Sequence, residues 1–74
     1  MPRDLPPWIY DRRRDLGDRI RQRRRSARLT QEGLAELTGI DRRTLQRIEV
    51  GTSDPPYSSL LLIAHALAVP VGDL

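Results

Sequence analysis

The sequence predicts an all-α fold, a compact bundle of about five short helices, on three grounds. The chain has 74 residues and no cysteine, so one small core has to form without disulfides or thiolate metal sites. Its apolar residues recur at helical spacing in successive stretches. Residues that cap helices precede two of these stretches and glycines follow them, which marks where those helices begin and end.

The chain divides into an N-terminal arm, residues 1–10, and a single domain, residues 11–74. Prolines break regular structure in the arm, although Pro7 also fits the first turn of a helix. Trp8 and Tyr10 are interpreted as anchors that pack on the domain. The alternative is a platform on which the bases of a single strand stack.

The first helix is expected over about residues 11–27, with Leu16, Ile20 and Ala27 near one face. Its aspartates come early and its arginines late, which favours the helix macrodipole. From the arm and this helix, Arg3 and Arg12 are candidates to reach a DNA groove.

Two short helices are expected next. Thr30 is predicted to cap a helix that ends at Gly39, in a left-handed conformation, and Asp41 to cap a helix that ends at Gly51. The residues predicted to face inward are Leu34, Ala35, Leu37, Leu45 and Ile48. These helices are separated only by the turn around Gly39, so they should pack closely.

A fourth helix is expected from Tyr57 or Ser58 to about Ala68. Its inward residues are predicted to be Leu60, Ile63, Ala64 and Leu67. Residues 69–74 then begin a last short turn or helix.

Charge is distributed unevenly along the chain. Residues 1–47 carry thirteen arginines and seven acidic residues, a net charge of +6, whereas residues 48–74 carry three acidic residues and no basic one, a net charge of −3. This asymmetry indicates one side that faces a polyanion. The use of arginine alone suits phosphate and guanine recognition, and a GC-rich coding bias explains it equally well.

Residues 30–51 predict a helix-turn-helix. Ala35 lies where the two helices cross closely, Gly39 allows the tight turn, and Leu45 fills the space between the helices. The second helix carries on its outward side Arg42, Arg43, Gln46 and Arg47. The hydrogen-bond donors of these side chains suit the base edges in a DNA major groove.

Further positions carry a family resemblance. They are Leu16-Gly17-x-x-Ile20-Arg21, Leu29-Thr30-Gln31, Leu34-Ala35, Gly39-Ile40, Thr44-Leu45, Arg47-Ile48-Glu49, Gly51, Pro55, Leu60, Ile63-Ala64, Leu67 and Leu74. With them, about residues 16–74 resemble the Cro and lambda-repressor type of helix-turn-helix domain, the Xre family. Arg28 stands where this family commonly has a turn glycine.

The resemblance implies a lambda-repressor-like bundle whose second and third helices form the DNA-reading unit. It implies double-stranded DNA as the partner and transcriptional regulation, as a repressor, as the role. The base contacts it implies are Arg42, Arg43, Gln46 and Arg47. The phosphate contacts are Gln31, Thr30, Arg28, Thr52 and Ser53. In the family, Gln31 also braces the first recognition residue, and Arg24 forms a structural ion pair with Glu49.

Four apolar residues near the end of the chain have two interpretations. They are Leu62, Ala66, Val69 and Leu74. Either they form a homodimer contact, or they pack under the N-terminal arm.

Other function classes fit the sequence less well. It contains no nucleophile–base pair, no metal-ligand set and no Gly-rich phosphate loop, so neither an enzyme nor a cofactor is expected. No apolar run is long enough to span a membrane, and the N-terminus lacks the apolar region of a signal peptide, so we expect a cytoplasmic protein. The resemblance implies that it is bacterial and associated with the nucleoid. The alternative function is a protein-interaction module that keeps the helix-turn-helix fold but does not read DNA.

Overall fold

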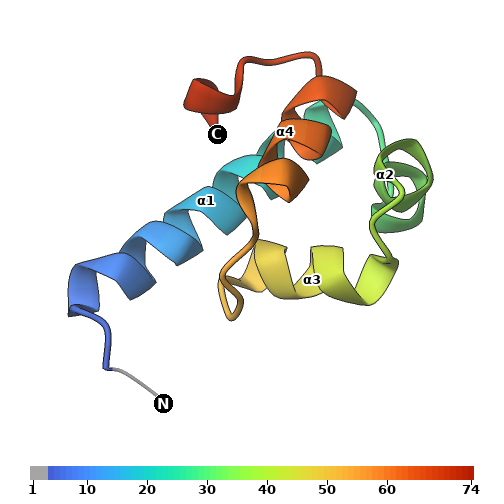
Figure 1. Cartoon of the computed structure of the whole chain (residues 1–74). Helices are drawn as coiled ribbons and strands as arrows, with labels where there is room; N and C mark the ends of the chain where they lie inside the picture. Colours follow the sequence, from blue (N-terminus) through green and yellow to red (C-terminus); the bar gives the residue numbers. More distant parts are fainter. Residues whose placement is uncertain (1–3) are drawn as a thin grey trace.

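The computed structural model describes residues 4–74 as four α-helices and a final turn of 3₁₀-helix (Figure 1). The elements are α1 (Pro7–Ser26), α2 (Gln31–Thr38), α3 (Arg42–Val50), α4 (Tyr57–Ala66) and η1 (Val71–Asp73). The predicted all-α class is confirmed. The last short turn or helix that was expected as the fifth helix is this single 3₁₀ turn, which follows Pro70.

The N-terminal arm is shorter than residues 1–10. Helix α1 begins at Pro7, four residues before the predicted start, because proline at the first helical position has the required φ and needs no N–H partner. The first turn of α1 therefore contains no acidic residue, and the predicted macrodipole benefit at this end is absent. The last turn does carry three arginines.

The caps of α2 and α3 agree with the predictions. The Thr30 side chain accepts a hydrogen bond from the Gly33 backbone N–H at 2.9 Å, and the Asp41 carboxylate accepts one from the Thr44 N–H at 3.2 Å. Helix α2 ends at Gly39 with φ 75°, and α3 ends at Gly51 with φ 81°. These left-handed glycines turn the chain sharply and allow α2 and α3 to pack together.

The core lies where the four helices meet. The buried residues at its centre are Ile20, Leu34, Leu45, Ile48 and Ile63. Two predicted inward residues are exposed: Ala27 follows the end of α1, and Leu37, with 61% of its surface exposed, lies on the outer side of α2. In an eight-residue helix, the inner face is already filled by Leu34 and by Thr38, whose hydroxyl donates to the Leu34 carbonyl oxygen at 2.8 Å.

Helices α1 and α3 approach each other at two glycines. A Cβ atom on Gly17 would lie 2.3 Å from the Glu49 carbonyl oxygen, and one on Gly51 would lie 2.9 Å from the Cα atom of Arg14. Only glycine fits at either position, so the backbone of α1 rests directly on the C-terminal end of α3. Figure 1 shows the C-terminal end of α3 below α1 and the N-terminal end of α3 away from α1, beside α2.

The first two turns of α1 project beyond the rest of the bundle (Figure 1). Trp8 is 58% exposed and Tyr10 37% exposed, so the prediction that they are packing anchors on the domain is wrong. Instead, the guanidinium of Arg12 lies 5.8 Å from the centre of the Trp8 ring, and that of Arg13 lies 5.3 Å from the Tyr10 ring. The aromatic rings are partnered locally because α1 carries them away from the core.

Candidate nucleic-acid interface

Helix α3 has one buried side and one exposed side. Leu45, Ile48 and Glu49 are buried in the domain. The residues exposed on the other side include all four predicted base contacts, Arg42, Arg43, Gln46 and Arg47. Because the buried side fixes the rotation of α3, these long polar side chains project together from a rigid element.

An ion pair holds the first residue of this exposed side. The Arg42 Nη1 atom lies 3.8 Å from Glu32 Oε1 on α2, and both side chains are more than half exposed. A pair so open to water is weak, with a typical strength below about 1 kcal/mol. Arg42 can therefore exchange Glu32 for another anion or for a base at little cost.

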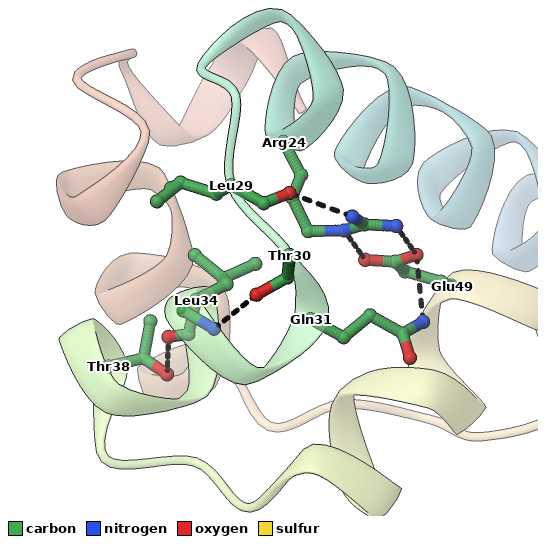
Figure 2. A network of polar contacts seen from close by, with 8 residues as sticks. Arg24, Leu29, Thr30, Gln31, Leu34, Thr38 and Glu49 are labelled. Carbon is green, nitrogen blue, oxygen red and sulfur yellow. Dashed lines mark hydrogen bonds and ion pairs between the residues drawn. The ribbon is translucent and has the colours of Figure 1, made fainter.

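A buried ion pair joins α1 to α3. The Arg24 guanidinium donates from Nε to Glu49 Oε2 at 2.7 Å and from Nη2 to Glu49 Oε1 at 2.9 Å (Figure 2). Its remaining nitrogen, Nη1, donates to the Leu29 carbonyl oxygen at 2.9 Å. This bidentate geometry is the strong form of an arginine–carboxylate contact.

Charge in this network is balanced. Its hydrogen bonds to Glu49 hold the pKa of the Arg24 guanidinium above its usual range, and burial offsets part of that rise. Glu49 is therefore neutralised from inside the domain. A carboxylate so close to the exposed side of α3 does not oppose a polyanion there.

Gln31 belongs to the same network. Its Nε2 atom donates to Glu49 Oε1 at 3.2 Å (Figure 2). In the free protein Arg42 pairs with Glu32, and Gln31 contacts Glu49. The bracing of Arg42 by Gln31 that the resemblance implies stays a prediction for the complex with DNA.

An open concavity lies at the N-terminus of α2. The residues that line it are Arg24, Arg25, Thr30, Gln31, Glu32 and Arg42. Thr30 accepts a hydrogen bond from the helix and keeps its own hydroxyl proton available for an anion. Arginines and the N-terminal end of a helix dipole on one concave surface suit a phosphate group.

The other predicted phosphate contacts are placed less favourably. Arg28 is exposed and has φ 58°, a left-handed conformation. The Thr52 hydroxyl donates to the Arg47 carbonyl oxygen at 3.4 Å. The Ser53 hydroxyl is buried, with no hydrogen-bond partner among residues 4–74, so its side chain does not face solvent as expected. Next to it, the exposed Asp54 pairs with Arg13 on α1 at 3.6 Å.

The four candidate dimer residues do not form one exposed patch. Ala66 and Leu74 pack against the core, Val69 is half-buried, and Leu62 is 47% exposed. On α4 it is Leu60 that lines a pocket with Ile9 from the first turn of α1, and none of the four candidates lines that pocket. Two exposed α4 residues, Tyr57 and Leu61, are not among the predicted candidates. Their i, i+4 spacing could have identified them as neighbours on one face of α4.

The two candidates for a groove contact from the arm differ in their placement. Arg3 lies outside residues 4–74, which the structure describes, and Arg12 packs over the Trp8 ring. Within those residues, no group of three or more acidic or histidine side chains could hold a metal ion. In the same part of the chain, no helix is long and apolar enough to cross a membrane.

Known proteins share this sequence and architecture. A helix-turn-helix family model matches residues 20–74. The chain is 38% identical over 71 residues to an "uncharacterized transcriptional regulator in ATPase CF(0) region" of Rhodospirillum rubrum, and the match covers 96% of this chain and 66% of that protein. It is 42% identical over 53 residues to an "uncharacterized HTH-type transcriptional regulator" of Methanothermobacter thermautotrophicus, covering 72% of this chain and 71% of that protein.

A solved structure is also similar. It is the crystal structure of the restriction-modification controller protein C.AhdI from Aeromonas hydrophila, with a TM-score of 0.84 and 31% sequence identity. The match covers 86% of this chain and 97% of that chain. The likeness therefore extends over nearly all of the helical bundle.

Proposed function

The chain belongs to the helix-turn-helix family, and on that premise we propose that it binds double-stranded DNA sequence-specifically through the major groove as a transcriptional repressor. One observation carries the proposal. Helix α3 buries one side in the core and exposes Arg42, Arg43, Gln46 and Arg47 on the other. The family and the fold are those of transcriptional regulators, which argues against a catalytic role.

Base recognition follows from the chemistry of these side chains. An arginine forks onto O6 and N7 of guanine, and a glutamine onto N6 and N7 of adenine, each worth about 1–3 kcal/mol of discrimination against a wrong base. Arg42 and Gln46 lie four residues apart and therefore share one stripe of α3. Arg43 and Arg47 form a second stripe beside it. Helix α3 thus offers two parallel rows to the floor of the groove.

Phosphate contacts orient the protein on the duplex. The concavity at the start of α2, with Thr30, Gln31 and Arg25, receives one backbone phosphate. The exposed side chains of Arg28 and Thr52 supply further contacts near either end of the unit. Because these contacts displace counterions, affinity falls as salt rises.

Repression requires only that the bound protein occupies its operator. Two copies on an inverted repeat bind tighter than one, with half-sites about 34–36 Å apart. The exposed Leu62 is the proposed contact between copies, and the protein acts in the cytoplasm at the nucleoid. The R. rubrum and M. thermautotrophicus relatives are named as transcriptional regulators, which supports this role.

Selection of bound sequences from a pool of random duplex DNA tests the proposal. The wild-type protein is expected to enrich one motif, and an inverted repeat shows that two copies bind together. The variants Arg43→Ala and Gln46→Ala should each lose preference at particular base positions. Glu36→Ala is the matched control, because Glu36 is an exposed helical residue on α2. If Arg43→Ala enriches the same motif as the wild type, α3 is not the reading helix.

The alternative, a protein-interaction module, has one observation in its favour. Tyr57, Leu61 and Leu62 are exposed apolar residues on α4. They lie on a different helix from the arginines, so they do not replace α3 as the reading surface. Failure of the wild-type protein to bind any duplex at low salt would favour this module.

A further inference from the structure

One face of α1 alternates acidic residues and arginines. The residues are Asp11, Arg14, Asp18, Arg21 and Arg25, at intervals of three or four residues, which places them in one row along the helix. We call this row the acid–arginine stripe. All of its residues except the half-exposed Arg21 are exposed.

Two arginines of the stripe are held by the aspartate that precedes them. Arg14 pairs with Asp11, and the Arg21 Nη2 atom lies 2.5 Å from Asp18 Oδ1. These are surface pairs between residues on the same helix, which contribute little to stability. Each pair keeps the guanidinium beside the carboxylate of its aspartate.

The stripe lies beside the reading helix. Gly17, where an added Cβ atom would meet the Ile48 and Glu49 carbonyl oxygens of α3, is three residues after Arg14 and four before Arg21. Both arginines therefore flank the contact with α3 on the same face of α1. At one end, Arg14 lies against Gly51, the residue that ends α3. At the other, Arg25 shares a concavity with Arg42, the residue that begins α3.

The length of the stripe matches a row of phosphates. From Arg14 to Arg25 the helix rises about 16 Å, so the three arginines run along α3 from its first residue to its end. A helix in the major groove, which is about 12 Å wide, has a phosphate backbone on each side. A basic row on α1 that reaches from the end of α3 to the concavity at its start can therefore follow one wall of the groove.

We propose that Arg14 and Arg21, which Asp11 and Asp18 hold off in the free protein, extend the phosphate contact at Arg25 into a second row along α1. This inference rests on the proposed function, since it requires a duplex in front of α3. On binding, the guanidinium groups of Arg14 and Arg21 exchange a carboxylate for a phosphate. Asp11 and Asp18 lower the attraction of the free protein for DNA of any sequence, because each carboxylate competes with phosphate for its arginine.

Salt dependence measures these contacts directly. Affinity for a random-sequence duplex and for the selected duplex is measured across salt concentration, with the full chain. Arg14→Gln and Arg21→Gln should each lower the slope of log affinity against log salt by about 1. The double variant should then lose about tenfold less affinity than wild type between about 50 and about 200 mM salt. Base preference should not change.

Arg19→Gln is the matched control. Arg19 is an exposed arginine of α1, outside the stripe, and its replacement changes net charge equally. If Arg14→Gln and Arg21→Gln shift the slope no more than Arg19→Gln, the second row does not exist. The same conclusion follows if they change only the oligomeric state. A circular-dichroism melt of each variant shows that it is folded.

The aspartates test the second part of the inference. Asp11→Asn and Asp18→Asn should raise affinity for the random-sequence duplex several-fold. The ratio of the affinity for the selected duplex to that for the random-sequence duplex should therefore fall. Asp15→Asn, an exposed residue of α1 outside the stripe, is the control. Equal gains from all three variants would overturn the holding role. If the wild type binds DNA but the stripe variants have the same affinity and salt dependence as their control variants, the inference fails while the proposed function stands. If the wild type binds no DNA, both fail.

Discussion

Gly17 rests against the carbonyl oxygen of Glu49, so close that an added Cβ atom would lie 2.3 Å away. This contact joins α1 to the C-terminal end of α3. The same residue, Glu49, holds Arg24 and Gln31 through its side chain. One residue of α3 thus fixes both how near α1 lies and how the N-terminus of α2 is oriented, which explains why α3 presents a rigid outward face.

Replacing Gly17 by alanine should destabilise the fold. The added methyl group meets backbone oxygens of α3, which cannot rotate away, and overpacking of this kind costs about 1–3 kcal/mol. Gly33→Ala is the matched control, since its nearest neighbours lie at 3.4 and 3.5 Å and both are side-chain atoms. Because alanine favours the helical conformation of α2 more than glycine does, Gly33→Ala should raise the free energy of unfolding by about 1 kcal/mol. Urea unfolding measures both, and equal effects would show that the α1–α3 contact is not tight.

Removing one partner of the Arg24–Glu49 pair should destabilise the fold far more than replacing both partners by apolar residues. Arg24→Met leaves a buried carboxylate and an unpartnered Leu29 carbonyl oxygen, and Glu49→Leu leaves a buried guanidinium, at about 3–5 kcal/mol each. The double variant removes both charges, so it should be much less destabilised than the two single changes together. A double-mutant cycle by chemical denaturation measures this coupling. Additive effects would mean that the two side chains do not interact.

Local chemistry makes much of the fold predictable from the sequence. The caps at Thr30 and Asp41, and the ends at Gly39 and Gly51, each depend on residues within a few positions of one another. The inward positions Leu45 and Ile48 follow from helical spacing in the same way. The outward face of α3 is the complement of these buried positions, so helical spacing alone identifies the candidate base contacts.

Features that depend on how helices cross could not be predicted in this way. Spacing alone does not show that Gln31 meets Glu49 rather than Arg42. It also does not show that Asp54 pairs with Arg13 of α1, or that the Ser53 hydroxyl is buried. Tertiary contacts decide each of these. The predicted start of α1 is wrong for a local reason, because the fit of Pro7 to a first helical turn outweighs the tendency of prolines to break a helix.

Two residues other than glycine adopt a left-handed backbone and should gain from glycine. Arg28 and Ala68 both have φ 58°, a conformation that costs a residue with a Cβ atom about 1–2 kcal/mol. Ala68→Gly should therefore raise stability by about 1 kcal/mol, after the greater entropy of unfolded glycine is subtracted. Ala27→Gly is the control, because Ala27 has an ordinary φ of −81°. A thermal melt in which Ala27→Gly gains as much as Ala68→Gly would contradict this account.

The cap of α3 should make stability depend on acid pH. Hydrogen bonds from the Thr44 hydroxyl and backbone N–H hold the pKa of Asp41 below its usual value of 3.8. A lowered folded-state pKa means that this stabilisation is complete above pH 3.8 and is lost as pH falls through the folded-state pKa. Asp41→Asn keeps a good cap without a titrating group. Its melting temperature should match wild type near neutral pH and fall less in acid, with Asp15→Asn as the charge control. Parallel melting curves for wild type and Asp41→Asn across this range would contradict the expectation.

Glu32 should limit binding to DNA of the wrong sequence. Its carboxylate lies 3.8 Å from Arg42 and lines the concavity proposed to receive a phosphate. Glu32→Gln removes a like charge from the phosphate site and frees Arg42, so affinity for random-sequence duplex should rise several-fold. Affinity for the selected duplex should rise less, because Arg42 already exchanges Glu32 for a base there. Glu36→Gln, one turn further along α2, makes the same change in net charge. Titrations of both variants against both duplexes decide the matter: equal gains would show that only net charge matters and that Glu32 has no special role.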